Sequence, residues 1–149
     1  KHIVSKEAFN IDGLGKKVVD QFWELNLIRK PSDIFKLNYN KINQLEGWGD
    51  LSIKNLKNAV LKARKISLSR FIYSIGIRHI GQENAKILAS FFISSEEFSN
   101  LFLTYKRKKI LNSLVDVDGI GETQINSIES FFQNPKNSYN KKINTNLII

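Results

Sequence analysis

The sequence contains no cysteine and no methionine, and among its 149 residues only two are histidines, His2 and His79. The lack of cysteine excludes disulfides and thiolate metal sites. Two histidines are too few for a histidine-based metal site unless carboxylates supply the other ligands. There is no run of 18 apolar residues and no signal-peptide pattern, so we expect a soluble, intracellular protein with no membrane partner. Because the chain starts at Lys1 and lacks Met, we also expect it to be a segment of a longer protein.

The apolar residues predict an ordered, all-α fold. They make up 42% of the chain and include ten Phe and two Trp, enough for a hydrophobic core. No segment alternates with a period of two, whereas apolar residues recur at helical spacing in several segments. Two longer helices should end near Leu27 and Lys65, and shorter ones should cover Ser32–Leu37 and Leu68–Ile75. Ser67 is an expected helix cap, and Ser94 with Glu97 fits a capping box.

The net charge of +9 is unevenly distributed. Residues 41–80 carry eight basic and two acidic side chains, a net +6, whereas residues 81–120 are balanced. A basic segment of this kind is typical of a nucleic-acid-binding protein, but it is also compatible with a solvated Lys-rich surface. The run Lys106–Lys109 is interpreted as a solvated linker, and an added phosphate contact is the alternative.

The glycines show an internal repeat. All eight fall into four pairs, Gly13 with Gly15, Gly47 with Gly49, Gly76 with Gly81, and Gly119 with Gly121. The second members follow one another after 34, 32 and 40 residues, a period typical of helical repeats. Each unit consists of an apolar helix, a glycine-containing hairpin and a second apolar helix. This pattern predicts four tandem helix-hairpin-helix motifs, arranged as two pseudo-symmetric pairs at residues 1–66 and 67–133. A polar tail or truncated helix at residues 134–149 would lead to a missing C-terminal domain.

Such hairpins are suited to binding phosphate. Hairpin N–H groups and helix N-termini attract anions, and phosphate contacts position a protein on DNA without reading its sequence. The expected DNA-binding residues are Gly13, Leu14, Gly15, Lys16, Gly47, Trp48, Gly49, Lys54, Gly76, Arg78, His79, Gly81, Gly119, Ile120, Gly121 and Thr123. Trp48 has two interpretations, a platform that stacks on a base and a hydrophobic plug between neighbouring units.

Charge ranks the four hairpins. Arg78 and His79 lie in the third, with no acidic residue between its glycines, so we expect this hairpin to bind most strongly. Asp116, Asp118 and Glu122 surround the fourth hairpin, and their negative charge should weaken its contact with phosphate.

Residues 71–81 resemble the corresponding segment of bacterial NAD-dependent DNA ligases, and residues 1–15 resemble the stretch after the last zinc cysteine of that family. Residues 31–37 and 45–49 also agree with the family in spacing. The resemblance implies an enzyme that seals nicks in duplex DNA with NAD through an adenylated lysine, and a region that helps to encircle the DNA. The chain lacks Lys-x-Asp-Gly and the zinc cysteines. We therefore expect no catalytic residue, metal or cofactor here, with NAD, Mg and structural Zn bound elsewhere in the parent protein.

These observations lead to one main hypothesis and two alternatives. The main hypothesis is a monomeric, non-catalytic module that binds duplex DNA, in particular nicked DNA, in the bacterial cytoplasm at the nucleoid. A helical scaffold for protein partners is an alternative, because stacked helix pairs also form concave surfaces. The DNA-binding domain of a nuclease or branch-processing protein is another.

Overall fold

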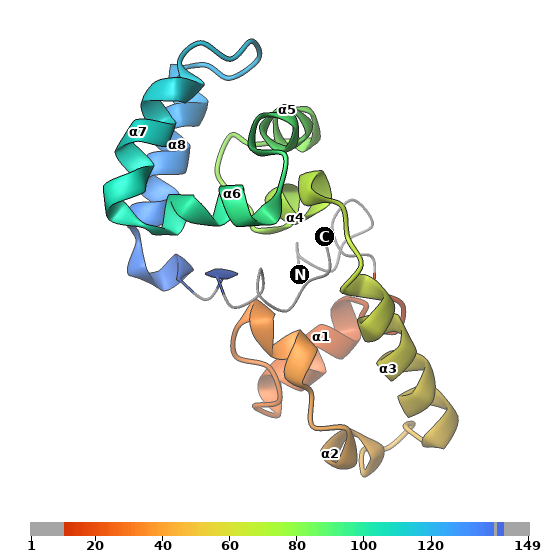
Figure 1. The fold of residues 1–149 in the computed structure, drawn as a ribbon. Coiled ribbons are helices and arrows are strands. Elements are labelled where there is room, and N and C mark those ends of the chain that lie inside the picture. Colours follow the sequence, from red (N-terminus) through yellow and green to blue (C-terminus); the bar gives the residue numbers. More distant parts are fainter. Residues whose placement is uncertain (1–10, 139, 142–149) are drawn as a thin grey trace.

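The structure, a computed structural model, describes residues 11–138, 140 and 141, so expectations for residues 1–10 and for most of the tail lie outside it. The described residues form helices and no β-strand, which confirms the all-α prediction (Figure 1). In chain order these are α1 (Lys16–Glu24), η2 (Pro31–Lys36), α2 (Tyr39–Asn43), α3 (Asp50–Ala63), α4 (Leu68–Ser74), α5 (Gln82–Phe92), α6 (Ser95–Ser99), η3 (Asn100–Phe102), α7 (Thr104–Leu114), α8 (Glu122–Gln133) and η4 (Pro135–Asn137), where η denotes a 3-10 helix.

The two serine caps have different outcomes. The Ser67 hydroxyl accepts a hydrogen bond from the Arg70 N–H at 3.3 Å, as expected. The Ser94 hydroxyl accepts from the Glu97 N–H at 3.1 Å, but the Ser94 N–H donates to the Phe92 carbonyl instead of to Glu97. Ile93 has a φ of 69°, which turns the chain back toward α5. Only one half of the expected capping box therefore forms.

The run Lys106–Lys109 lies within α7, so its interpretation as a linker was wrong. Arg107 is buried, and its Nε donates a hydrogen bond of 2.8 Å to the Leu101 carbonyl in η3. This bond satisfies a carbonyl at the end of a short helix and ties α7 to the segment before it. Three of the four basic side chains in the run remain exposed.

The helices form two groups, α1–α3 at one end of the molecule and α4–α8 at the other (Figure 1). Phe98 of α6 is fully buried at the centre of the second group. Its ring centroid lies 6.0 Å from Phe71, 5.2 Å from Phe92 and 5.8 Å from Phe132. A single aromatic side chain therefore joins α4, α5 and α8, mainly through edge-to-face contacts.

Four short turns, at residues 11–14, 45–48, 77–80 and 117–120, share one backbone form. In each, the N–H of the fourth residue donates to the carbonyl of the first, at 3.2, 3.1, 3.1 and 3.2 Å in chain order. The third residue has a φ of 87°, 83°, 64° and 89° in the same order. These are the features of a type II β-turn. The glycine after each turn is the N-cap of α1, α3, α5 and α8, respectively.

The third turn departs from the glycine pairing expected from the sequence. Gly76 follows the C-cap of α4 with a φ of 73°, so it ends that helix. The residue equivalent to Gly13, Gly47 and Gly119 is His79, whose φ is 64°. A side chain in this left-handed region costs about 1–2 kcal/mol relative to a right-handed conformation. His79 is therefore held in a strained conformation by the turn around it.

We predict that Gly119→Ser lowers the free energy of unfolding by about 1–2 kcal/mol, because serine is strained at positive φ. The new Cβ would also meet Cδ1 of Ile87. Gly49→Ser is the matched control, since Gly49 has a φ of −145° and no atom within 4 Å of a Cβ built there. Its free energy should change by less than about 0.5 kcal/mol, because serine is a favourable N-cap. Urea unfolding followed by circular dichroism measures both, and equal losses would contradict the assignment.

Candidate nucleic-acid interface

The helix that follows each turn starts with N–H groups that have no partner inside the helix. The first helical hydrogen bond runs to the carbonyl of the N-cap glycine, from Val19 at 3.0 Å, Ile53 at 2.9 Å, Ala85 at 3.0 Å and Ile125 at 3.0 Å. The three N–H groups before each of these residues precede the helical ladder. They point out of the positive end of the helix, where an anion is favoured.

The N–H of the N-cap glycine itself is already used in three of the four turns. The Ser52 hydroxyl accepts it from Gly49 at 2.8 Å, and the Gln124 side chain accepts it from Gly121 at 2.9 Å. The Asn84 side chain accepts the N–H of Gly81 at 3.2 Å. An anion at these turns would therefore meet the N–H groups of the next three residues. A polar side chain three residues after Gly49, Gly81 and Gly121 is the sequence signal that could have predicted this, whereas Val18 follows Gly15.

The predicted site residues differ in what they can offer a ligand. Leu14 and Ile120 are 1% and 5% exposed, so only their main chain can take part. Trp48 is half-buried. The exposed members are Gly13, Gly15, Lys16, Gly47, Gly49, Lys54, Gly76, Arg78, His79, Gly81, Gly119, Gly121 and Thr123.

In the first pair of turns, each following helix packs against the other turn. The ring centroid of Trp48, in the second turn, lies 5.7 Å from that of Phe22 on α1. In return, a Cβ built on Gly13 of the first turn would lie 3.8 Å from Leu56 on α3. This contact favours the interpretation of Trp48 as a plug between units.

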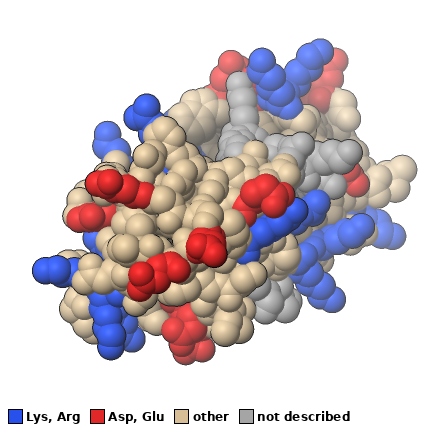
Figure 2. All heavy atoms as spheres, turned by 90° about the horizontal axis from the view of Figure 1, so that it is seen from above, with Lys and Arg blue, Asp and Glu red and all other residues tan. Residues whose placement is uncertain are grey.

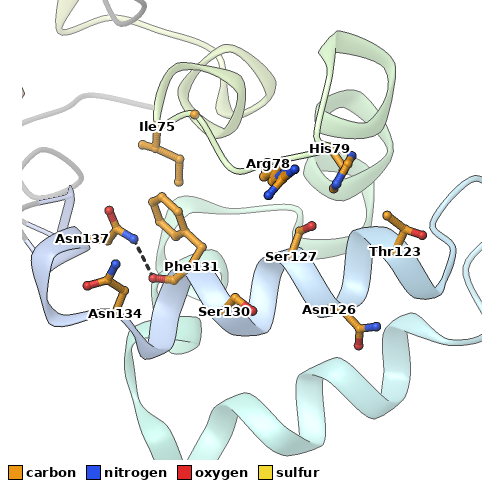
Figure 3. Close-up of a pocket in the computed structure, with 11 residues that line it drawn as sticks. Ile75, Arg78, His79, Thr123, Asn126, Ser127, Ser130, Phe131, Asn134 and Asn137 are labelled. Atoms are coloured by element: carbon orange, nitrogen blue, oxygen red, sulfur yellow. Dashed lines mark hydrogen bonds between the residues drawn. The ribbon is translucent and has the colours of Figure 1, made fainter.

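In the second pair, one following helix contacts the other turn directly, and the other helix faces its turn across an opening. The side-chain amide of Asn84 on α5 donates a 3.1 Å hydrogen bond to the carbonyl of Gly119 in the fourth turn. In return, Arg78 and His79 of the third turn lie over the face of α8 that carries Thr123 and Ser127 (Figure 3). The structure therefore brings the predicted residues of turns three and four together, as it does those of turns one and two.

The four turns differ in charge. Their second residues are Asp12, Glu46, Arg78 and Asp118, so the third turn alone is basic at this position. Asp116 and Glu122 add to the negative charge around the fourth turn. Seen from above Figure 1, acidic side chains are interspersed with lysines and arginines on that face of the molecule (Figure 2). The local charge therefore differs from one turn to the next.

The described residues also bear on metal sites and on membrane-spanning helices. Across residues 11–138, 140 and 141, no three or more His, Asp or Glu side chains come together in a way that could hold a metal ion. Within the same residues, no helix has the length and apolar character needed to cross a membrane.

Residues 70–139, which contain the third and fourth turns, match the family described as "Helix-hairpin-helix motif". This part of the chain is a helix-hairpin-helix region, as predicted; the total of four such motifs stays a prediction. Over 92% of its length the chain is similar to proteins named DNA ligase. It is 57% identical over 137 residues to that of Pelagibacter ubique (strain HTCC1062), and 43% identical over 141 residues to that of Wolbachia pipientis subsp. Culex pipiens (strain wPip).

A third relative, the DNA ligase of Rickettsia bellii (strain OSU 85-389), is 40% identical over 145 residues. The match covers 20%, 21% and 21% of the three relatives, respectively, so the chain spans about a fifth of their length. The resemblance to DNA ligases expected from the sequence is confirmed.

We predict that Trp48→Ala lowers the free energy of unfolding by about 2–3 kcal/mol, because it leaves a cavity beside Phe22. Trp23→Ala is the control, since Trp23 is 51% exposed and contacts the Arg29 guanidinium at 5.8 Å from its ring centroid. Its loss should be about 1 kcal/mol or less. Chemical denaturation measures both variants. A Trp48→Ala variant of unchanged stability and reduced DNA affinity would identify Trp48 as a base-stacking residue instead.

Proposed function

We propose that this chain binds duplex DNA without regard to sequence, as the non-catalytic helix-hairpin-helix region of an NAD-dependent DNA ligase. The observation that carries the proposal is the shared geometry of the four turns. Each turn is closed by one main-chain hydrogen bond and is followed by a helix with a glycine N-cap. The first N–H groups of that helix lack a helical partner. These donors would contact phosphate oxygens.

Main-chain donors account for the proposed lack of sequence preference. Phosphate oxygens are the same at every base pair, so contacts to them fix position and orientation only. Because contacts link the turns in pairs, each pair would present two sets of N–H groups, one for each strand across the minor groove. The similarity to proteins named DNA ligase supports DNA as the ligand over a protein partner.

In the longer protein, this module would hold a nicked duplex while other parts seal it. The resemblance assigns the adenylated lysine, NAD, Mg and the structural Zn to segments outside this chain, which contains no Lys-x-Asp-Gly. In this role the module acts as a monomer in the bacterial cytoplasm, at the nucleoid.

We predict that duplex affinity falls about a thousandfold between about 50 and 200 mM salt, as expected if roughly six phosphates are neutralised. Fluorescence anisotropy with two labelled duplexes of unrelated sequence measures this, and both should bind equally. A flat salt response, or a strong preference for one duplex, would contradict the proposal and favour the helical scaffold for protein partners.

We predict that Arg78→Ala weakens duplex binding about tenfold or more, because a charge-assisted bond to phosphate is worth about 1.5–3 kcal/mol. Arg29→Ala is the matched control, as Arg29 is exposed but lies over the Trp23 ring, outside the four turns. It removes the same charge and should change affinity less than about threefold. The comparison is made at about 100 mM salt, with helical content checked by circular dichroism. Equal effects would show that only the total charge matters.

A further inference from the structure

A groove of about 700 Å³ separates the third turn from α8. One wall is formed by the end of α4 and by Arg78 and His79 of the turn (Figure 3). The other wall is the face of α8 that carries Ser127 and Ser130. The groove therefore begins at the most basic of the four turns and continues along a helix.

The α8 wall is uncharged and mostly polar, with Phe131 as its one apolar side chain. Thr123, Asn126, Ser127 and Ser130 line it, and no Asp or Glu does. Hydroxyl and amide groups of this kind are common donors to phosphate and sugar oxygens. From Thr123 to Ser130 the helix rises about 10 Å.

In the other half of the pair, an isoleucine fills the equivalent place beside the fourth turn. α5 and α8 begin after the equivalent glycines Gly81 and Gly121, so Ile87 and Ser127 occupy the same position, six residues on. Ile87 lies so close to the fourth turn that a Cβ on Gly119 would collide with its Cδ1. On α8 the equivalent residue is the smaller Ser127, and the space between it and the third turn is open.

His79 adds a second observation. Three turns use glycine at the left-handed position, whereas the third places an imidazole there, at the rim of the groove. Strain of this kind persists where the surrounding structure over-determines it, and it is concentrated at functional sites. Its side chain is exposed, so it does not serve the core.

We propose that this groove holds one phosphodiester strand, with Arg78 and His79 donating to phosphate oxygens and the hydroxyls of Ser127 and Ser130 donating further along the same strand. The inference rests on the proposed duplex binding and extends it from the turns to the face of α8. It makes the two halves of the second pair unequal: one encloses a strand, and the other offers main-chain donors alone.

The first test is Ser127→Ile, which copies Ile87 and fills the groove. Duplex affinity at about 100 mM salt should fall about fivefold or more, corresponding to the loss of one or two hydrogen bonds and of access. Helical content should be unchanged by circular dichroism. Unchanged affinity in the folded variant would overturn the proposal.

The second test is a matched pair that does not depend on the packing at Ser127. Ser130 lies nine residues after Gly121 and lines the groove, whereas Ser90 lies nine residues after Gly81 on α5 and is also exposed. Ser130→Asp should weaken binding about fivefold, since a carboxylate repels phosphate, and Ser90→Asp less than about twofold. Equal effects would overturn the groove proposal. If the parent chain does not bind duplex at about 50 mM salt, both the proposed function and the groove proposal are wrong. If the parent chain binds and the groove variants bind with unchanged affinity, only the groove proposal is wrong.

Discussion

One main-chain hydrogen bond, made four times, governs the arrangement of this protein. It closes a turn of four residues whose first and fourth side chains are apolar and are buried or half-buried. Those two side chains anchor the turn to the core, and the backbone between them is forced outward. The next glycine then starts a helix in a direction set by the turn. The positions of the exposed N–H groups therefore follow from core packing and not from any surface side chain.

The repeat made much of the fold predictable. A glycine pair recurring every 32 to 40 residues marks both the turn and the start of the next helix, and these elements lie where the pattern predicted them. The helix cap at Ser67 was also predictable, because its signal lies in the residue itself and its immediate neighbours. The spacing of the glycines did not predict which residues form the third turn. There Ile77 and Ile80 bury themselves on either side of His79 and hold it at positive φ without a glycine.

The burial of Arg107 is a second feature that could not be predicted from the sequence. A run of four basic residues is typical of a solvated segment, and the run by itself does not show that its one arginine, Arg107, is buried. Helical periodicity places Arg107 on the inner face with Leu111 and Leu114, and the open carbonyl of Leu101 supplies its partner. That partner lies on another element, so only the tertiary structure reveals it. The glycines that start the helices after the turns were predictable, but not which of their N–H donors are already occupied.

The substitution of serine for isoleucine between the two halves of the second pair has a consequence for direction. A pair with equal halves would fit a duplex equally well in either of two orientations related by its pseudo-twofold axis. With Ile87 filling one half and Ser127 leaving the other open, the two orientations would differ in energy in the proposed complex. The module would then bind the duplex in one preferred direction along the DNA axis.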